Sequence, residues 1–148
     1  MTRPPHLLLV EAPYYRHIAD GLRRGAERVI AEAGATFESI EVPGAFEVPA
    51  AIGFAARASS RFDGFVALGC VIRGETTHYD HICQESSRAL QDLAAREGLA
   101  IGFGILTCEN EAQAVVRSDP AAKDKGGEAA RACLAMVALK RRFAGGNG

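Results

Sequence analysis

The sequence predicts an α/β fold of three layers (αβα), in which helices cover both faces of a four-stranded parallel sheet. Apolar segments of strand length alternate with longer segments of helical periodicity along the whole chain. Parallel strands need crossover connections, usually helices, and these bury the sheet. The length of 148 residues is that of one domain. We therefore expect a single domain over residues 1–148, with flexible tails at about 1–5 and 144–148.

The first half of the chain is expected to hold two strands and two helices. The apolar segment "HLLLVEA" (6–12) is predicted to be a buried strand, and residues 16–33 carry an apolar stripe of helical spacing. The segment "TFESIEV" (36–42) is predicted to be the second strand. An alanine-rich helix is expected at about 46–58, since Pro49 falls in its first turn, where proline is tolerated.

The second half repeats the alternation. We expect a third strand in "FDGFVALGCVI" (62–72), a helix at about 77–97 and a fourth strand in "LAIGFGILT" (99–107). A short helical segment around 111–117 and a last helix at about 126–143 complete the predicted order. No internal repeat and no low-complexity linker divides the chain.

Composition excludes several functional classes. The net charge of −1, with 24% charged residues, argues against binding to nucleic acid or to membrane surfaces. No apolar run is long enough to span a bilayer, and the N-terminal segment lacks the pattern of a signal peptide, so we expect a cytoplasmic protein. The four cysteines form no Cys-x-x-Cys pair, which favours small buried side chains in a reducing compartment over zinc or redox chemistry.

Polar and aromatic residues follow each predicted strand. Ligands of open parallel sheets bind at the carboxyl ends of the strands, where these segments should meet. We therefore expect a pocket at that edge of the sheet. The residues gathered there are Tyr14, Tyr15, Phe46, Glu47, Thr76, Thr77 and His78.

The two histidines of "GETTHYDHI" are separated by their helical positions. His81 shares a face with Glu85 and Arg88, which indicates a solvated stripe. His78 shares a face with Ile82 and should lie at the mouth of the pocket, where an imidazole can transfer protons near neutral pH. A metal site made by His78 and His81 is the alternative, although no third ligand has suggestive spacing.

Thr76 and Thr77 precede the predicted helix. Hydroxyl side chains at a helix start are commonly N-caps, and at least one of the two should be a cap. A helix N-terminus also suits a phosphate. Because the chain has neither a P-loop nor a dinucleotide fingerprint, a small monophosphate fits better than a nucleotide.

Several motifs taken together resemble those of the 6,7-dimethyl-8-ribityllumazine synthase family. They are "VPGAFEVP", "ALGCVIRGETTHYDHI", "GFGILTCENEAQA", Arg117 and "DKGGEAA", and the resemblance extends over about residues 7–140. It implies a flavodoxin-like topology and a transferase of riboflavin biosynthesis. In that family a ribitylamino-pyrimidinedione condenses with 3,4-dihydroxy-2-butanone 4-phosphate, without a metal or a redox cofactor.

The resemblance also implies a role for individual residues. His78 matches the histidine assigned to proton transfer. Arg117 matches the arginine that anchors the substrate phosphate, together with Thr76 and the backbone of Glu75. The remaining positions match residues beside the pyrimidine and the ribityl chain, namely Tyr14, Ala45, Phe46, Glu47, Cys70, Val71 and Ile72 from one subunit and Phe103 and Lys125 from its neighbour.

Strand geometry favours a neighbouring subunit as the source of Phe103. This residue stands near the start of its strand, whereas Thr107 stands near the end, roughly 13 Å further along. A side chain at the start of a strand cannot easily reach a pocket at the carboxyl edge of its own sheet. We therefore expect a homo-oligomer with shared sites, for which the family suggests a ring of five subunits, and riboflavin synthase is a candidate partner.

Two positions depart from the family pattern. Tyr14-Tyr15 stands where the family usually has Phe-Asn, and Asp124 replaces the usual Asn before Lys125. Tyr14 still offers a ring for stacking, but the polar contact of the lost Asn has no evident substitute. Two alternatives stay open: a catalytically weak flavin- or lumazine-binding protein, which only the Tyr14-Tyr15 departure supports, and a shell- or ring-forming protein on the same scaffold without turnover.

Overall fold

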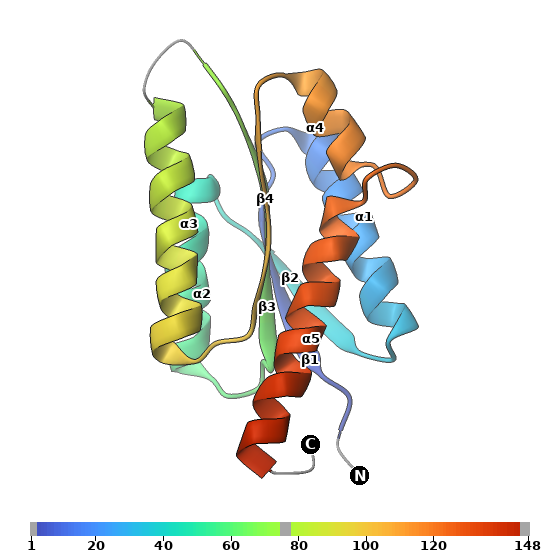
Figure 1. Ribbon diagram of the computed structural model, residues 1–148, viewed down its shortest axis with the longest axis vertical. Helices are drawn as coiled ribbons and strands as arrows, with labels where there is room; N and C mark the ends of the chain where they lie inside the picture. Colours follow the sequence, from blue (N-terminus) through green and yellow to red (C-terminus); the bar gives the residue numbers. More distant parts are fainter. Residues whose placement is uncertain (1–2, 75–77, 146–148) are drawn as a thin grey trace.

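The computed structural model describes residues 3–74 and 78–145 (Figure 1). Its four strands form one parallel sheet in the order β2-β1-β3-β4. The elements are β1 (His6–Ala12), α1 (Arg16–Glu32), β2 (Thr36–Glu41), the 3₁₀ turn η1 (Ala45–Glu47), α2 (Val48–Ala58), β3 (Gly64–Ile72), α3 (His78–Glu97), β4 (Ile101–Cys108), α4 (Glu111–Ser118) and α5 (Lys125–Gly145).

The sheet lies between two layers of helices, as predicted. Helices α1, α4 and α5 cover one face, and α2 and α3 cover the other (Figure 1). Successive residues of a strand point to opposite faces. Leu7 and Leu9 of β1 therefore pack in one core cluster with α1 and α5, whereas Leu8 and Val10 pack in the other with α2. The α/β fold class and its three layers are confirmed.

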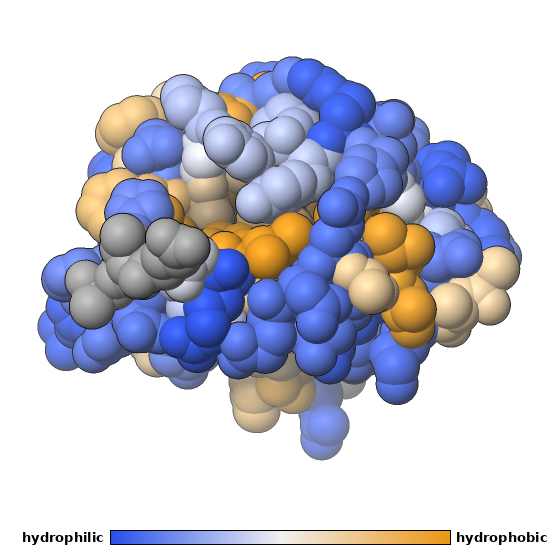
Figure 2. All heavy atoms as spheres, turned by 90° about the horizontal axis from the view of Figure 1, so that it is seen from above, coloured by the Kyte–Doolittle hydropathy of each residue, from blue (hydrophilic) through white to orange (hydrophobic). Residues whose placement is uncertain are grey.

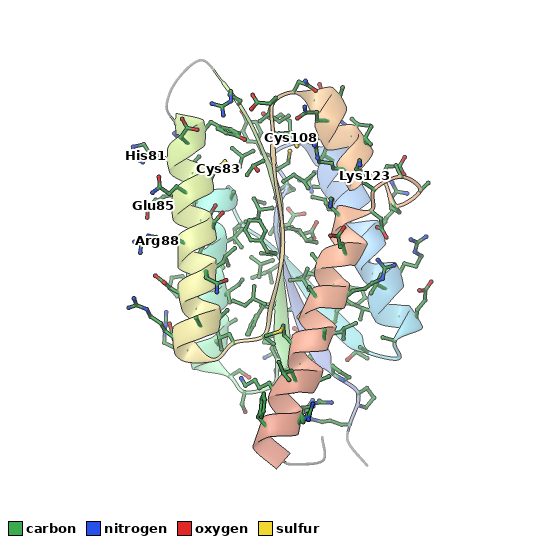
Figure 3. The ribbon with its side chains drawn as sticks, in the orientation of Figure 1. His81, Cys83, Glu85, Arg88, Cys108 and Lys123 are labelled. Atoms are coloured by element: carbon green, nitrogen blue, oxygen red, sulfur yellow. The ribbon has the colours of Figure 1, made fainter. Side chains whose placement is uncertain are left out.

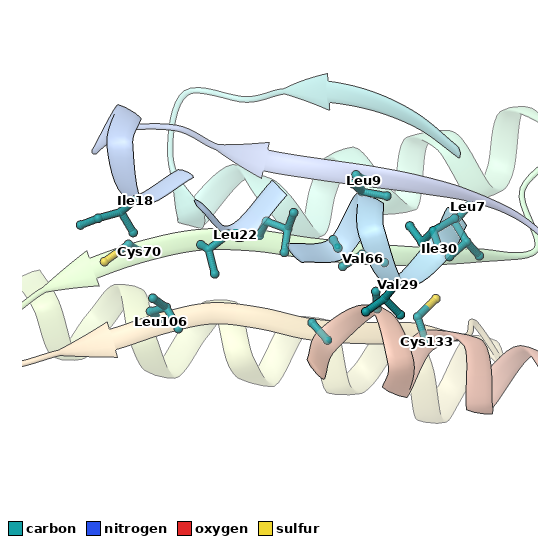
Figure 4. Close-up of a cluster of buried hydrophobic side chains, with 14 of the residues drawn as sticks. Leu7, Leu9, Ile18, Leu22, Val29, Ile30, Val66, Cys70, Leu106 and Cys133 are labelled. Atoms are coloured by element: carbon teal, nitrogen blue, oxygen red, sulfur yellow. The ribbon is translucent and has the colours of Figure 1, made fainter. Parts of the chain in front are cut away.

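Figure 4 shows the first of these clusters, which contains the larger share of the buried side chains. Helix α5 packs closely against α1 and β4 because the residues at the contact points are glycines, which have no Cβ atom. A Cβ atom on Gly126 would overlap the carbonyl oxygen of Leu22 in α1. A Cβ atom on Gly102 of β4 would likewise overlap the carbonyl oxygen of Ala129. These positions bring the backbones of α5, α1 and β4 together.

Several predicted boundaries differ from the structure by one or two residues; for example, the fourth strand was expected at 99–107 and is Ile101–Cys108. The helix expected at 46–58 begins as the turn η1, and Pro49 occupies the first turn of α2 that follows. Strand β3 begins at Gly64, two residues later than predicted; just before it, the Asp63 N–H donates to the His6 carbonyl oxygen at 2.7 Å and the Asp63 carboxylate accepts the His6 N–H at 2.8 Å. Helix α5 runs on to Gly145, two residues beyond the predicted end.

The cysteines lie largely where the composition indicated. Cys70, Cys108 and Cys133 are buried, Cys83 is half-buried, and all four are free thiols. In the described part of the chain, no helix combines the length and apolar character needed to cross a membrane.

Candidate functional site

A cavity opens at the carboxyl edge of the sheet, where the strand order changes direction. From β1 the chain goes to β2 on one side of the sheet, and later to β3 on the other. Ligands of doubly wound sheets bind at such switch points. The cavity has a volume of about 650 Å³, and the view from above shows hydrophobic residues among polar ones there (Figure 2). Its lining residues are Ala12, Tyr14, Tyr15, Gly44, Ala45, Phe46, Glu47, Cys70, Val71, Ile72, His78, His81 and Ile82.

The end of β3 forms the floor of this cavity. Pairing between β1 and β3 ends with Ala12 opposite Gly69, whereas β3 pairs with β4 as far as Ile72. Val71 and Ile72 therefore extend past β1, and their backbone edge on that side faces the cavity. Backbone N–H and C=O groups seek hydrogen-bond partners, and these can bind the polar edge of a heterocycle.

Exposed aromatic rings border the cavity on two sides. Tyr14 is 78% exposed, and Phe46 on η1 is 57% exposed. The ring of Tyr15 packs edge-on against Tyr14, with 4.9 Å between the centroids, and it also contacts the buried core. Tyr15 therefore supports the ring of Tyr14, which can cover a flat ligand.

Glu47 supplies a carboxylate at the rim. The turn η1 is closed by a hydrogen bond from the Glu47 N–H to the Gly44 carbonyl oxygen at 3.0 Å. Among the described residues, no cation forms an ion pair with Glu47, and a carboxylate of this kind accepts hydrogen bonds from hydroxyl groups.

Both histidines of α3 border the cavity, although only His78 was expected there. His78 is the first residue of α3 and is exposed at the cavity mouth. His81 lies with Glu85 and Arg88 on the outer face of α3, as predicted (Figure 3), yet it also contributes to the rim. Residues three apart share one side of a helix, and this spacing could have predicted the rim position. The described residues contain no group of three or more potential metal ligands.

Cys70 lies on the floor as a protonated thiol. Burial, reinforced by the neighbouring Cys108, raises the pKa of Cys70 to about 12. Because the thiolate is the nucleophilic form, Cys70 is inert near neutral pH and contributes shape and apolar surface.

Several predicted site residues lie elsewhere in this chain. Phe103 pairs with Ala67, three residues before Cys70, and is therefore displaced by roughly 10 Å along the strand from the floor. Arg117 lies in the last turn of α4, and Lys125 begins α5, where its amine pairs with Glu128 at 3.2 Å. None of these three is among the described residues lining the cavity. Glu75, Thr76 and Thr77 lie outside the described residues.

Asp124, the second departure from the family pattern, forms its ion pairs with arginines. Its backbone has a φ of 47°, a left-handed conformation that Asp and Asn tolerate better than most residues. The carboxylate accepts from the Gly127 N–H at 3.2 Å and pairs with Arg28 at 3.2 Å and with Arg131 at 3.9 Å. Its added negative charge is thus compensated by two arginines.

Comparison with known proteins agrees with the architecture. A family model for 6,7-dimethyl-8-ribityllumazine synthase matches residues 4–141. The chain belongs to the lumazine synthase family. A lumazine synthase of Agrobacterium fabrum is 55% identical over 145 residues, covering 95% of this chain and 98% of the relative. A lumazine synthase of Bartonella tribocorum is 52% identical over 143 residues, covering 97% of this chain and 95% of the relative.

A third relative is 6,7-dimethyl-8-ribityllumazine synthase 1 of Rhizobium meliloti, which is 51% identical over 145 residues, with 95% of each chain covered. The resemblance to the lumazine synthase family that the sequence motifs indicated is confirmed. Eight of the residues implied by those motifs line one cavity: Tyr14, Ala45, Phe46, Glu47, Cys70, Val71, Ile72 and His78.

Proposed function

We propose that the chain condenses 5-amino-6-(D-ribitylamino)pyrimidine-2,4-dione with 3,4-dihydroxy-2-butanone 4-phosphate to give 6,7-dimethyl-8-ribityllumazine, the penultimate step of riboflavin biosynthesis. The observation that carries this proposal is the cavity at the β1/β3 switch point, which combines aromatic rings, a free backbone edge, a carboxylate and His78. The relatives that match nearly the whole chain bear the name of this synthase.

The pyrimidine is proposed to bind on the floor of the cavity. Its polar edge pairs with the backbone of Val71 and Ile72, and its ring is covered by Phe46 and Tyr14, whose exposed faces support stacking. The Glu47 carboxylate accepts hydrogen bonds from ribityl hydroxyls. Ala45 and Cys70 present small side chains that leave room for the ligand.

The butanone phosphate is proposed to bind beside the N-terminus of α3. A guanidinium can form two parallel hydrogen bonds with a phosphate, which suits Arg117 as its main anchor. Thr76 and the backbone of Glu75 are assigned to the same phosphate site because they match the family motif. Arg117 is not among the described residues that line the cavity of its own chain, which supports an arginine contributed by an adjacent copy.

The reaction needs proton transfers and close placement of two substrates. The pyrimidine amine attacks the ketone, and loss of water gives a Schiff base. Phosphate then leaves, and attack of the second amine on the resulting carbonyl closes the ring and expels another water. His78 is proposed to move protons during these steps, since an imidazole can both accept and donate a proton. Holding both substrates together supplies the rest of the acceleration. No metal or cofactor is required.

We also propose that the chain acts as a homo-oligomer, a ring of five subunits in which Phe103, Arg117 and Lys125 enter the neighbour's site. Large apolar side chains on the surface support this, including Phe54 at 67% and Phe143 at 78% exposure. The four free thiols support a reducing, cytoplasmic location. The enzyme of the last step, riboflavin synthase, is proposed as a partner because it consumes the product.

The proposal is tested by incubating the purified protein with both substrates and following the absorbance of the lumazine chromophore. Product should form well above the rate of the uncatalysed condensation measured without protein, and equally in the presence of a chelator. Binding of lumazine by a folded protein that adds nothing to the uncatalysed rate would favour the binding-protein alternative. Loss of activity with chelator and recovery with zinc would favour a metal site at His78 and His81.

A further inference from the structure

Arg73 connects the ends of two strands with the first turn of α3. It directly follows β3, and its N–H donates to the Cys108 carbonyl oxygen at 2.9 Å, which prolongs the pairing with β4. Its Nε donates to the Glu109 carboxylate at 2.7 Å. Its guanidinium lies 4.4 Å from the centroid of the Tyr79 ring and 3.6 Å from the Asp80 carboxylate. One side chain thus contacts the β4–α4 connection and the start of α3.

The partners of Arg73 are themselves held in place. The Glu109 N–H donates to the Gln113 side chain at 2.9 Å, and Asn110 caps α4 by accepting from the Gln113 N–H at 2.9 Å. Thr107 at the end of β4 and Cys83 one turn along α3 lie close enough to Tyr79 to influence the pKa of its hydroxyl, which burial raises above its ordinary value. The first turn of α3 is therefore attached to the end of β4 chiefly through Arg73.

This arrangement has more consequence for orientation than for overall stability. The side chains of Arg73, Glu109 and Asp80 are 44%, 57% and 62% exposed, and ion pairs that are so exposed add little to the free energy of unfolding. The Arg73 guanidinium, however, combines a flat face for stacking with N–H groups in fixed directions, and an ammonium group has neither. His78 directly precedes Tyr79 and lines the cavity.

We infer that Arg73 is a positioning residue: it holds the first turn of α3 against the ends of β3 and β4 and thereby fixes the direction of the His78 imidazole. The inference rests on the role proposed for His78 in the condensation. Arg73 is not among the described residues that line the cavity, so it acts through Tyr79 and Asp80 rather than on the substrates.

The test compares Arg73→Met with Arg88→Met as a matched control. Arg88 lies on the outer face of α3, is 64% exposed and pairs with Asp92 at 3.6 Å, so its loss removes a similar exposed ion pair from the same helix. Arg73→Met should lower kcat about tenfold, since small displacements of a reacting group are costly. It should leave the KM of the pyrimidine unchanged and shift Tm no more than Arg88→Met does.

A double-mutant cycle separates positioning from a general structural role. In the His78→Ala background, Arg73→Met should have no further effect on kcat, because the residue that it positions is gone. An unchanged kcat in Arg73→Met, or an equal loss in both backgrounds, would overturn the inference and leave the role of His78 intact. A normal kcat in His78→Ala would instead overturn the proposed role of His78, and the inference with it.

Discussion

Sites that are shared between subunits can be tested by mixing two impaired variants. Phe103 is displaced by roughly 10 Å along β4 from the cavity floor, and Arg117 and Lys125 lie on the segments that follow the same strand. If these residues complete the site of an adjacent copy, His78 and Arg117 of one chain belong to two different sites. A chain with a damaged His78 can then complement a chain with a damaged Arg117.

The expected recovery follows from the assembly of a closed ring. When His78→Ala and Arg117→Ala chains are unfolded, mixed equally and refolded, a site is intact only if each neighbour supplies its undamaged residue. This combination occurs in about one quarter of the sites, because each of the two choices has a probability of about one half. The mixture should therefore regain about 25% of wild-type turnover, provided that each variant alone has lost most of its activity.

The assay is the rate of lumazine formation, with mixed oligomers verified by native mass spectrometry. Each variant carried separately through the same refolding provides the control. If verified mixed oligomers show only the average activity of the two variants, each chain supplies its whole site, and the inference from strand position is wrong.

Three further predictions concern single residues. His78→Ala should lower kcat by about 10²-fold or less, because general acid–base catalysis typically contributes about 10²-fold or more and this condensation also proceeds without a catalyst. His81→Ala should be nearly silent. A larger loss in His81→Ala than in His78→Ala would reverse the roles assigned to the two histidines. Tyr14→Phe should keep its activity, while Tyr14→Ala should weaken pyrimidine binding by about 1 kcal/mol, measured by calorimetry; a large loss in the Phe variant would give the hydroxyl a direct contact. Burial tends to raise the pKa of Asp63, but hydrogen bonds from the His6 N–H and from Arg3 outweigh it and hold that pKa below its ordinary value. The stability that the Asp63 carboxylate contributes is thus present above pH 3.8 and is lost as the pH falls further. Asp63→Asn should therefore reduce the free energy of unfolding by roughly 1–2 kcal/mol at pH 7 and by less in acid. Urea titration at the two pH values measures this difference. An equal difference at both pH values would mean that the charge of Asp63 contributes nothing.

Local pattern was sufficient for the fold and for part of the cavity. Strand β1 and helix α1 were predicted almost to the residue, because a continuous apolar run and an amphipathic stripe are signals carried by neighbouring residues. The convergence of Tyr14, Glu47 and His78 followed from one topological rule, that parallel strands end at the same edge.

The tertiary structure decided what depends on contacts between distant segments. The sequence does not show that β3 extends past β1 and leaves the backbone of Val71 and Ile72 facing the cavity, because register is set by packing of the whole sheet. Nor could it reveal that Arg73 stacks on Tyr79 while it pairs with Glu109, 36 positions along the chain. Composition and periodicity report on neighbours in sequence, whereas the distances and angles of a site are set only when separate elements pack together.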